Sequence, residues 1–88
     1  MSDPGKFIAA VEKYKEGQSV EMQKGYDFAI DKIVKEEISV TQVYSYSNTD
    51  HRYYHQLRRD LGIKENDLFF RGFVKACKDI VTKSEEKR

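Results

Sequence analysis

Hydrophobic residues recur at helical spacing along most of the chain. This pattern predicts four helices, over residues of about 4–16, 19–36, 50–61 and 67–83. Residues that can cap a helix precede all four of them: Ser2 or Asp3 before Pro4, Ser19, one of Asn48 to Asp50, and Asn66 or Asp67. Gly62 can end the third. We therefore predict a mainly α fold with four helices.

Residues 38–47 follow a different pattern. Ile38, Val40, Tyr44 and Tyr46 alternate with Ser and Thr, and this period of two is typical of a strand. A lone strand leaves its backbone hydrogen-bonding groups unsatisfied, and no second strand is predicted in the chain. Two alternatives stay open: a short strand over 38–46 that pairs with the same segment of a second copy, or a short helix of poor intrinsic propensity.

The 88 residues are predicted to form a single domain, 1–88. It would combine an N-terminal helical pair, 1–36, with a second part, 38–83. A chain this short buries a modest fraction of its surface, so we expect a homodimer. A single cysteine fits a reducing compartment. No apolar run is long enough to span a membrane, and the sequence starts without a signal peptide's apolar region. We expect a cytoplasmic protein.

Charge is distributed unevenly between the two halves. Residues 1–50 carry six lysines and nine acids, a net of −3, whereas residues 51–83 carry eight Lys or Arg and four acids, a net of +4. The most one-sided segment is 51–59, with three arginines, two histidines and no acid. Wound as a helix with the residues that follow, it places Arg52, His55 and Arg59 on one side. The opposite side carries an apolar stripe of Tyr53, Tyr54, Leu57 and Leu61. A basic helix face of this kind can contact a phosphate backbone.

The run from Ile38 to Val81 resembles the ribbon-helix-helix family of DNA-binding proteins. The resemblance rests on Tyr54, Leu57, Leu61-Gly62-Ile63, Asn66-Asp67-Leu68-Phe69, Gly72 and Phe73. It implies a dimer whose two strands pair as a ribbon in the major groove. By position it also implies base contacts from Thr41, Val43 and Ser45, and a phosphate held at Lys64 to Asn66.

A second DNA-binding hypothesis is a helix-turn-helix. Residues 39–46 would form the supporting helix, 47–49 the turn and 50–61 the recognition helix. This arrangement places Arg52, His55 and Arg59 in the groove.

The function predicted from these patterns is a small DNA-binding regulator of the transcriptional, plasmid or phage kind. Arg52, Arg58, Arg59 and Lys64 are predicted to contact phosphates, with the three arginine heads facing solvent. His55, Thr41 or Ser45 would lie nearer the bases. The alternative is a non-catalytic helical adaptor or inhibitor that binds another protein. Its grounds are the near-zero net charge, the outlying Phe28 and the tyrosine-rich stretch 44–54.

Catalytic chemistry is not predicted. The sequence has no Gly-rich phosphate loop, nucleophile motif or paired-acid constellation, so we expect no enzyme and no cofactor. His51 and His55 stand at i, i+4, but a third metal ligand is not evident, because Cys77 falls on an apolar face. We therefore expect no metal site.

Overall fold

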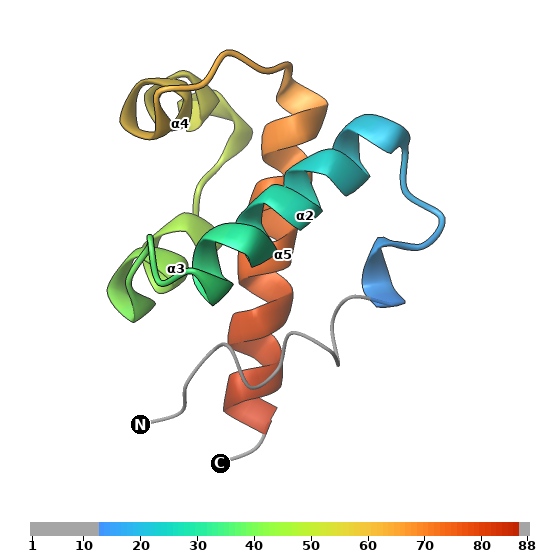
Figure 1. Ribbon diagram of the computed structural model, residues 1–88, viewed down its shortest axis with the longest axis vertical. Helices are drawn as coiled ribbons and strands as arrows, with labels where there is room; N and C mark the ends of the chain where they lie inside the picture. The colour runs from blue at the N-terminus through green and yellow to red at the C-terminus, as the bar shows by residue number, and fades with distance from the viewer. Residues whose placement is uncertain (1–12, 87–88) are drawn as a thin grey trace.

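The computed structural model describes residues 13–86, and within them every regular element is helical (Figure 1). The elements in chain order are η2 (Lys13–Lys15), α2 (Val20–Val34), α3 (Val40–Ser47), η3 (His51–Tyr53), α4 (Tyr54–Leu61) and α5 (Asp67–Glu86). This confirms the predicted mainly α fold. The helix predicted over 4–16 lies largely outside the described residues, and the part inside them forms the short 3-10 turn η2.

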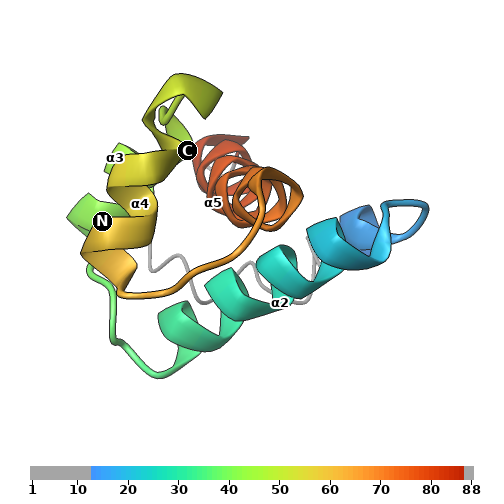
Figure 2. The same ribbon diagram turned by 90° about the horizontal axis from the view of Figure 1, so that it is seen from above.

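Helix α5 is the centre of the molecule, and α2 crosses it closely (Figures 1 and 2). Two glycines permit the crossing. A Cβ on Gly25 would stand 1.7 Å from the carbonyl oxygen of Phe69, and a Cβ on Gly72 would stand 1.9 Å from that of Met22. Glycine costs about 1 kcal/mol of helix propensity relative to alanine. Here the backbone-to-backbone contact that only glycine allows explains its place in both helices.

The core is built around aromatic rings on α5. Phe70 and Phe73 are fully buried. The ring of Phe28 lies 5.4 Å from that of Phe69 and 5.9 Å from that of Phe73, centroid to centroid. From α3, Tyr46 places its ring edge-on at 5.5 Å from Phe73. From the sequence, Phe28 could be either covered by another helix or exposed to a partner. In the structure it packs against α5 within the chain.

Residues 40–47 form helix α3, so the alternative of a strand over 38–46 is wrong. A capping box starts the helix: Ser39 Oγ accepts from the Gln42 N–H, and Gln42 Oε1 accepts from the Ser39 N–H. Helical spacing also points Val43 and Tyr46 toward α5, and Val43 is 1% exposed. Because β-propensity spans only about 1 kcal/mol, this cap and this burial outweigh it.

The segment thus supplies no strand for the ribbon that the ribbon-helix-helix resemblance implies. Val43, one of the residues that would read bases from that ribbon, is buried in the core.

Candidate nucleic-acid interface

Elements η3 and α4 follow each other without a break and together form what we call the 51–61 helix. It is separated from the end of α3 by three residues, 48–50. Asp50 caps its start, because Asp50 Oδ1 accepts from the Arg52 N–H at 3.1 Å. That hydrogen bond holds the pKa of Asp50 below its usual value. Helix, three-residue turn and helix is the order that the helix-turn-helix hypothesis predicted, with each boundary moved by about one residue.

The 51–61 helix is anchored through a narrow apolar side. Tyr54 is 7% exposed and Leu57 is 3% exposed, and the Tyr54 ring lies 6.1 Å from that of Phe70. The helix ends at Gly62, which adopts the left-handed conformation with φ of 68°. Tyr53, which the helical wheel placed near the apolar stripe, is instead 47% exposed. The side of the helix opposite Tyr54 and Leu57 is therefore exposed to solvent.

That outer side carries much of the predicted basic face. Arg52, His55 and Arg59 are all exposed, together with Gln56 and Asp60. Arg52 donates to the Asp50 carboxylate at 3.3 Å, and its guanidinium lies 5.9 Å from the Tyr53 ring centroid. Arg59 makes no ion pair within the described part of the chain. Lys64 is likewise exposed, in the loop that follows α4.

Arg58 serves the fold, and the prediction of a solvent-facing head was wrong for it. Its Nε donates to the carbonyl oxygen of Glu65 at 2.8 Å, and its Nη2 pairs with the Asp67 carboxylate. Its guanidinium also stacks over Phe70, 5.1 Å from the ring centroid. With 31% of its side chain exposed, Arg58 ties α4 to the 62–66 loop and the start of α5. These contacts could not be predicted from the residues around Arg58, because Glu65, Asp67 and Phe70 come close to it only where the chain turns back between α4 and α5.

The remaining predicted site residues are dispersed. Asn66 caps α5, since its side-chain oxygen accepts from the Phe69 N–H at 3.0 Å. Thr41 and Ser45 are exposed on α3. Ser45 lines a hollow of about 270 Å³ between α3 and α4, with Tyr53 and Gln56 on its other side. The structure thus brings Ser45 beside the 51–61 helix, whereas Thr41 does not line this hollow.

Ion pairs divide the cations of the described residues into two groups. Six cations of the described residues are ion-paired to acids: Lys15, Lys32, Lys35, Arg52, Arg58 and Lys75. In the basic second half, those that make no ion pair with another described residue are Arg59, Lys64, Arg71 and Lys78. Arg71 and Lys78 are not among the site residues predicted from the sequence.

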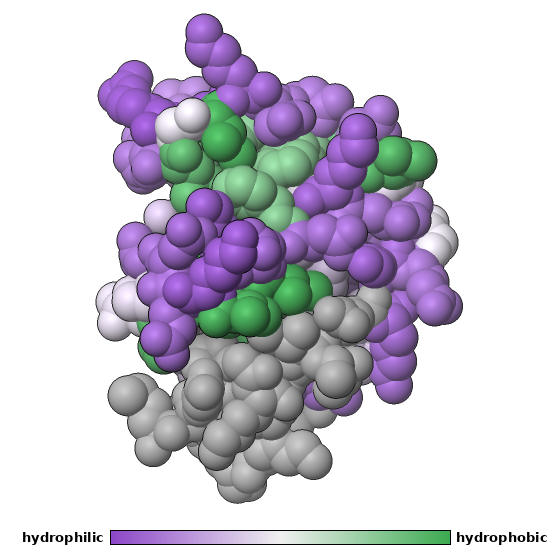
Figure 3. Space-filling model, in the orientation of Figure 1, coloured by the Kyte–Doolittle hydropathy of each residue, from purple (hydrophilic) through white to green (hydrophobic). Residues whose placement is uncertain are grey.

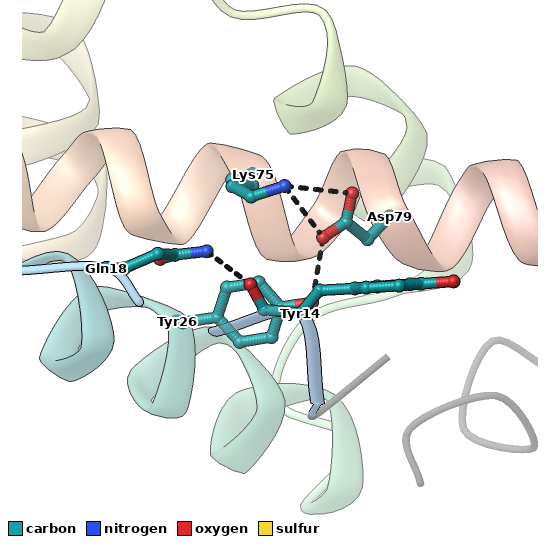
Figure 4. Close-up of polar contacts among 5 residues, drawn as sticks. All are labelled: Tyr14, Gln18, Tyr26, Lys75 and Asp79. Atoms are coloured by element: carbon teal, nitrogen blue, oxygen red, sulfur yellow. Dashed lines mark hydrogen bonds and ion pairs between the residues drawn. The ribbon is translucent and has the colours of Figure 1, made fainter. Parts of the chain in front are cut away.

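A buried polar network connects α2 with α5 (Figure 4). The Tyr26 hydroxyl donates to the Asp79 carboxylate at 2.9 Å, and Lys75 Nζ lies 3.2 Å from the same carboxylate. Burial, followed by the hydrogen bond to Asp79, raises the pKa of Tyr26. The network satisfies a fully buried phenol, and we assign it to stability.

Other reactive side chains are held in structural roles. Cys77 is fully buried, and desolvation raises the pKa of its thiol to about 12. His51 Nδ1 lies 2.8 Å from the Asp50 carboxylate. Across residues 13–86, no three His, Cys, Asp or Glu side chains gather as a metal site would require.

Polar residues cover most of the face seen in Figure 3, with hydrophobic residues showing between α4 and α2. None of the described helices combines the length and apolarity needed to cross a membrane.

No family model, curated protein or solved structure matches the chain.

Proposed function

We propose that this protein is a small DNA-binding regulator, acting in the cytoplasm on transcription, and that the outer side of the 51–61 helix contacts duplex DNA. The observation that carries the proposal is the exposed basic side of this helix, which follows α3 after a three-residue turn. In helix-turn-helix proteins the second helix enters the major groove and its N-terminal residues meet base edges.

Position along the helix divides the contacts. Arg52 and His55 belong to the N-terminal part, so they are assigned to base edges or adjacent phosphates. Arg59 lies a turn further on and is assigned to a phosphate, as is Lys64 in the following loop. Arg52 can move from Asp50 to DNA, because both are exposed and their pairing on the surface is weak.

The adaptor or inhibitor hypothesis is the second candidate. Phe28 is partly buried and packs against α5, which weakens one of its grounds, while Tyr53 at 47% exposure and Leu68 at 39% exposure support it. A partner protein would bury these two side chains. DNA binding would depend instead on the cations of the 51–61 helix.

Two neighbouring arginines provide a matched test. We expect Arg59→Ala to weaken binding of a fluorescent duplex and to lower the slope of log K against log salt by about 0.9, the value for one phosphate contact. We expect the same variant to keep the stability of the parent, since Arg59 makes no ion pair within residues 13–86. Binding is measured by anisotropy over a salt series, and stability by urea unfolding.

Arg58→Ala should behave in the opposite way. It removes a hydrogen bond to a backbone carbonyl, an ion pair and a stacking contact, and we expect a loss of about 1–2 kcal/mol of unfolding free energy with a smaller effect on the salt slope. Parent protein that binds no duplex more tightly than about 10⁻⁴ M at low salt, the weak end of non-specific affinity, contradicts the proposed function.

A further inference from the structure

Helix α5 carries a second basic feature, a row formed by Arg71, Lys75 and Lys78, which we call the α5 row. The spacing of i, i+4 and i+7 places the three side chains along one side of the helix. At 1.5 Å per residue the row is about 10 Å long. Arg71 and Lys78 are exposed, whereas Lys75 is half-buried. Figure 4 shows Lys75 beside Asp79, with which it pairs.

The α5 row borders two adjoining surface hollows. One, of about 350 Å³, is lined by all three cations together with Thr49 and Tyr54. The other, of about 510 Å³, shares Arg71 and Tyr54 with the first and also includes His51. His51 is the first residue of the 51–61 helix. The two hollows therefore connect the α5 row with the N-terminal end of that helix.

The acids around these hollows are already engaged. Asp79 accepts from Tyr26 and pairs with Lys75. Asp50 pairs with Arg52 and His51, and Asp67 pairs with Arg58. Arg71 and Lys78 make no ion pair with another described residue. The surface therefore presents two uncompensated positive charges.

We propose that the α5 row holds the phosphate backbone of duplex DNA beside the 51–61 helix; this inference rests on the proposed function. Phosphates of one strand recur every 3.4 Å along the duplex axis, so a row about 10 Å long can lie beside two or three of them. An acidic protein partner would need an apolar anchor at the centre of its contact. Three apolar side chains line the hollow nearest the row: Tyr54 and Val74 are buried and Met22 is partly buried. None of them is fully exposed as an anchor, which favours the phosphate backbone.

The test compares two double variants of equal charge change in the full chain. Arg71→Gln with Lys78→Gln removes the uncompensated charges of the α5 row. Lys24→Gln with Lys35→Gln, the α2 variant, removes two exposed charges from α2 and its C-cap, where Lys35 pairs with Asp31 on the surface. Binding to a fluorescent duplex is followed over a salt series, and circular dichroism verifies that each variant is folded.

We expect the α5 variant to lower the slope of log K against log salt by about 1.8, the value for two phosphate contacts, and the α2 variant to leave it near that of the parent. Equal losses in both variants would mean an effect of net charge and would overturn the proposal. Competition by poly-glutamate as strong as by DNA of equal charge would also overturn it, in favour of an acidic protein.

The two proposals can fail separately. If Arg59→Ala weakens duplex binding while the α5 variant matches the parent, the proposal for the α5 row is contradicted and the proposal for the 51–61 helix is kept. If the parent binds no duplex at all, the proposed function is contradicted, and so is this inference.

Discussion

At the scale of single residues, the two glycines at the α2–α5 crossing decide how closely the helices approach. Gly72→Ala offers a direct measurement. Alanine favours a helix by about 1 kcal/mol, but its Cβ would stand 1.9 Å from the Met22 carbonyl oxygen. The obstacle is backbone, so the helices must separate. We expect a net loss of about 1–3 kcal/mol in unfolding free energy, the usual range for overpacking, measured by urea denaturation.

Thr82→Ala is the control for this prediction. Thr82 is exposed on the same helix, so replacing it by alanine improves propensity without a new contact. We expect it to be neutral or stabilising. A Gly72→Ala variant that gains stability to the same extent would show that the two helices do not touch at this crossing.

Two other buried residues link stability to alkaline pH. In the folded chain the pKa of Cys77 rises from 9.0 to about 12, and that of Tyr26 is raised above 10.0. The unfolded chain releases the Cys77 proton above about pH 9 and the Tyr26 proton above about pH 10, while the folded chain keeps both. Their contribution is therefore complete below the unfolded pKa values and is lost as pH rises, by up to about 1.4 kcal/mol per pH unit for each group.

The measurement is a series of urea unfolding curves at increasing pH. We expect Cys77→Ala and Tyr26→Phe each to show a shallower fall of stability than the parent above about pH 9. The comparison uses the slopes, because each substitution also changes packing. Slopes identical to that of the parent would contradict the buried, protonated state of these groups.

At the scale of elements, α3 depends on its N-terminal cap more than its neighbours do. Its sequence is rich in Val, Thr, Tyr and Ser, which are weak helix formers, so the capping box and the packing of Val43 maintain it. We expect Ser39→Ala to cost about 1 kcal/mol of unfolding free energy and to speed hydrogen exchange of the first α3 amides. Ser45→Ala, at an exposed position within the helix, is the control, and it should neither lower the unfolding free energy nor speed this exchange.

At the scale of the whole molecule, the described elements form one body around α5. The radius of gyration, 12.0 Å, equals the roughly 12 Å expected for a compact chain of this length. The second copy that strand pairing was expected to supply is therefore not needed to complete the described core.

A homodimer remains a prediction, now for the complex with DNA. Helix-turn-helix proteins bind as dimers to half-sites about 34–36 Å apart, so we expect two chains on each duplex that carries two such half-sites. Sedimentation of a labelled duplex at saturation gives the number of chains. A single chain per duplex would contradict the prediction and leave a monomeric binder.

The positions of the longer helices followed from the sequence alone. A period near 3.6 and a capping residue are local properties, which is why α2, the 51–61 helix and α5 begin and end within about three residues of the predicted bounds. The exposure of Arg52, His55 and Arg59 was likewise predicted, because the two sides of a helix follow from the order of its residues.

Contacts between distant residues settled the rest. Alternation over 38–47 favoured a strand, and the capping box together with the packing of Val43 and Tyr46 against α5 gives a helix. In the same way, Arg58 and Arg59 were both predicted to contact phosphates with solvent-facing heads, yet the return of the chain through 62–67 engages Arg58 and leaves Arg59 exposed. Periodicity specifies which side of a helix is apolar, whereas the partner of that side, and of each charge, depends on where the other helices lie.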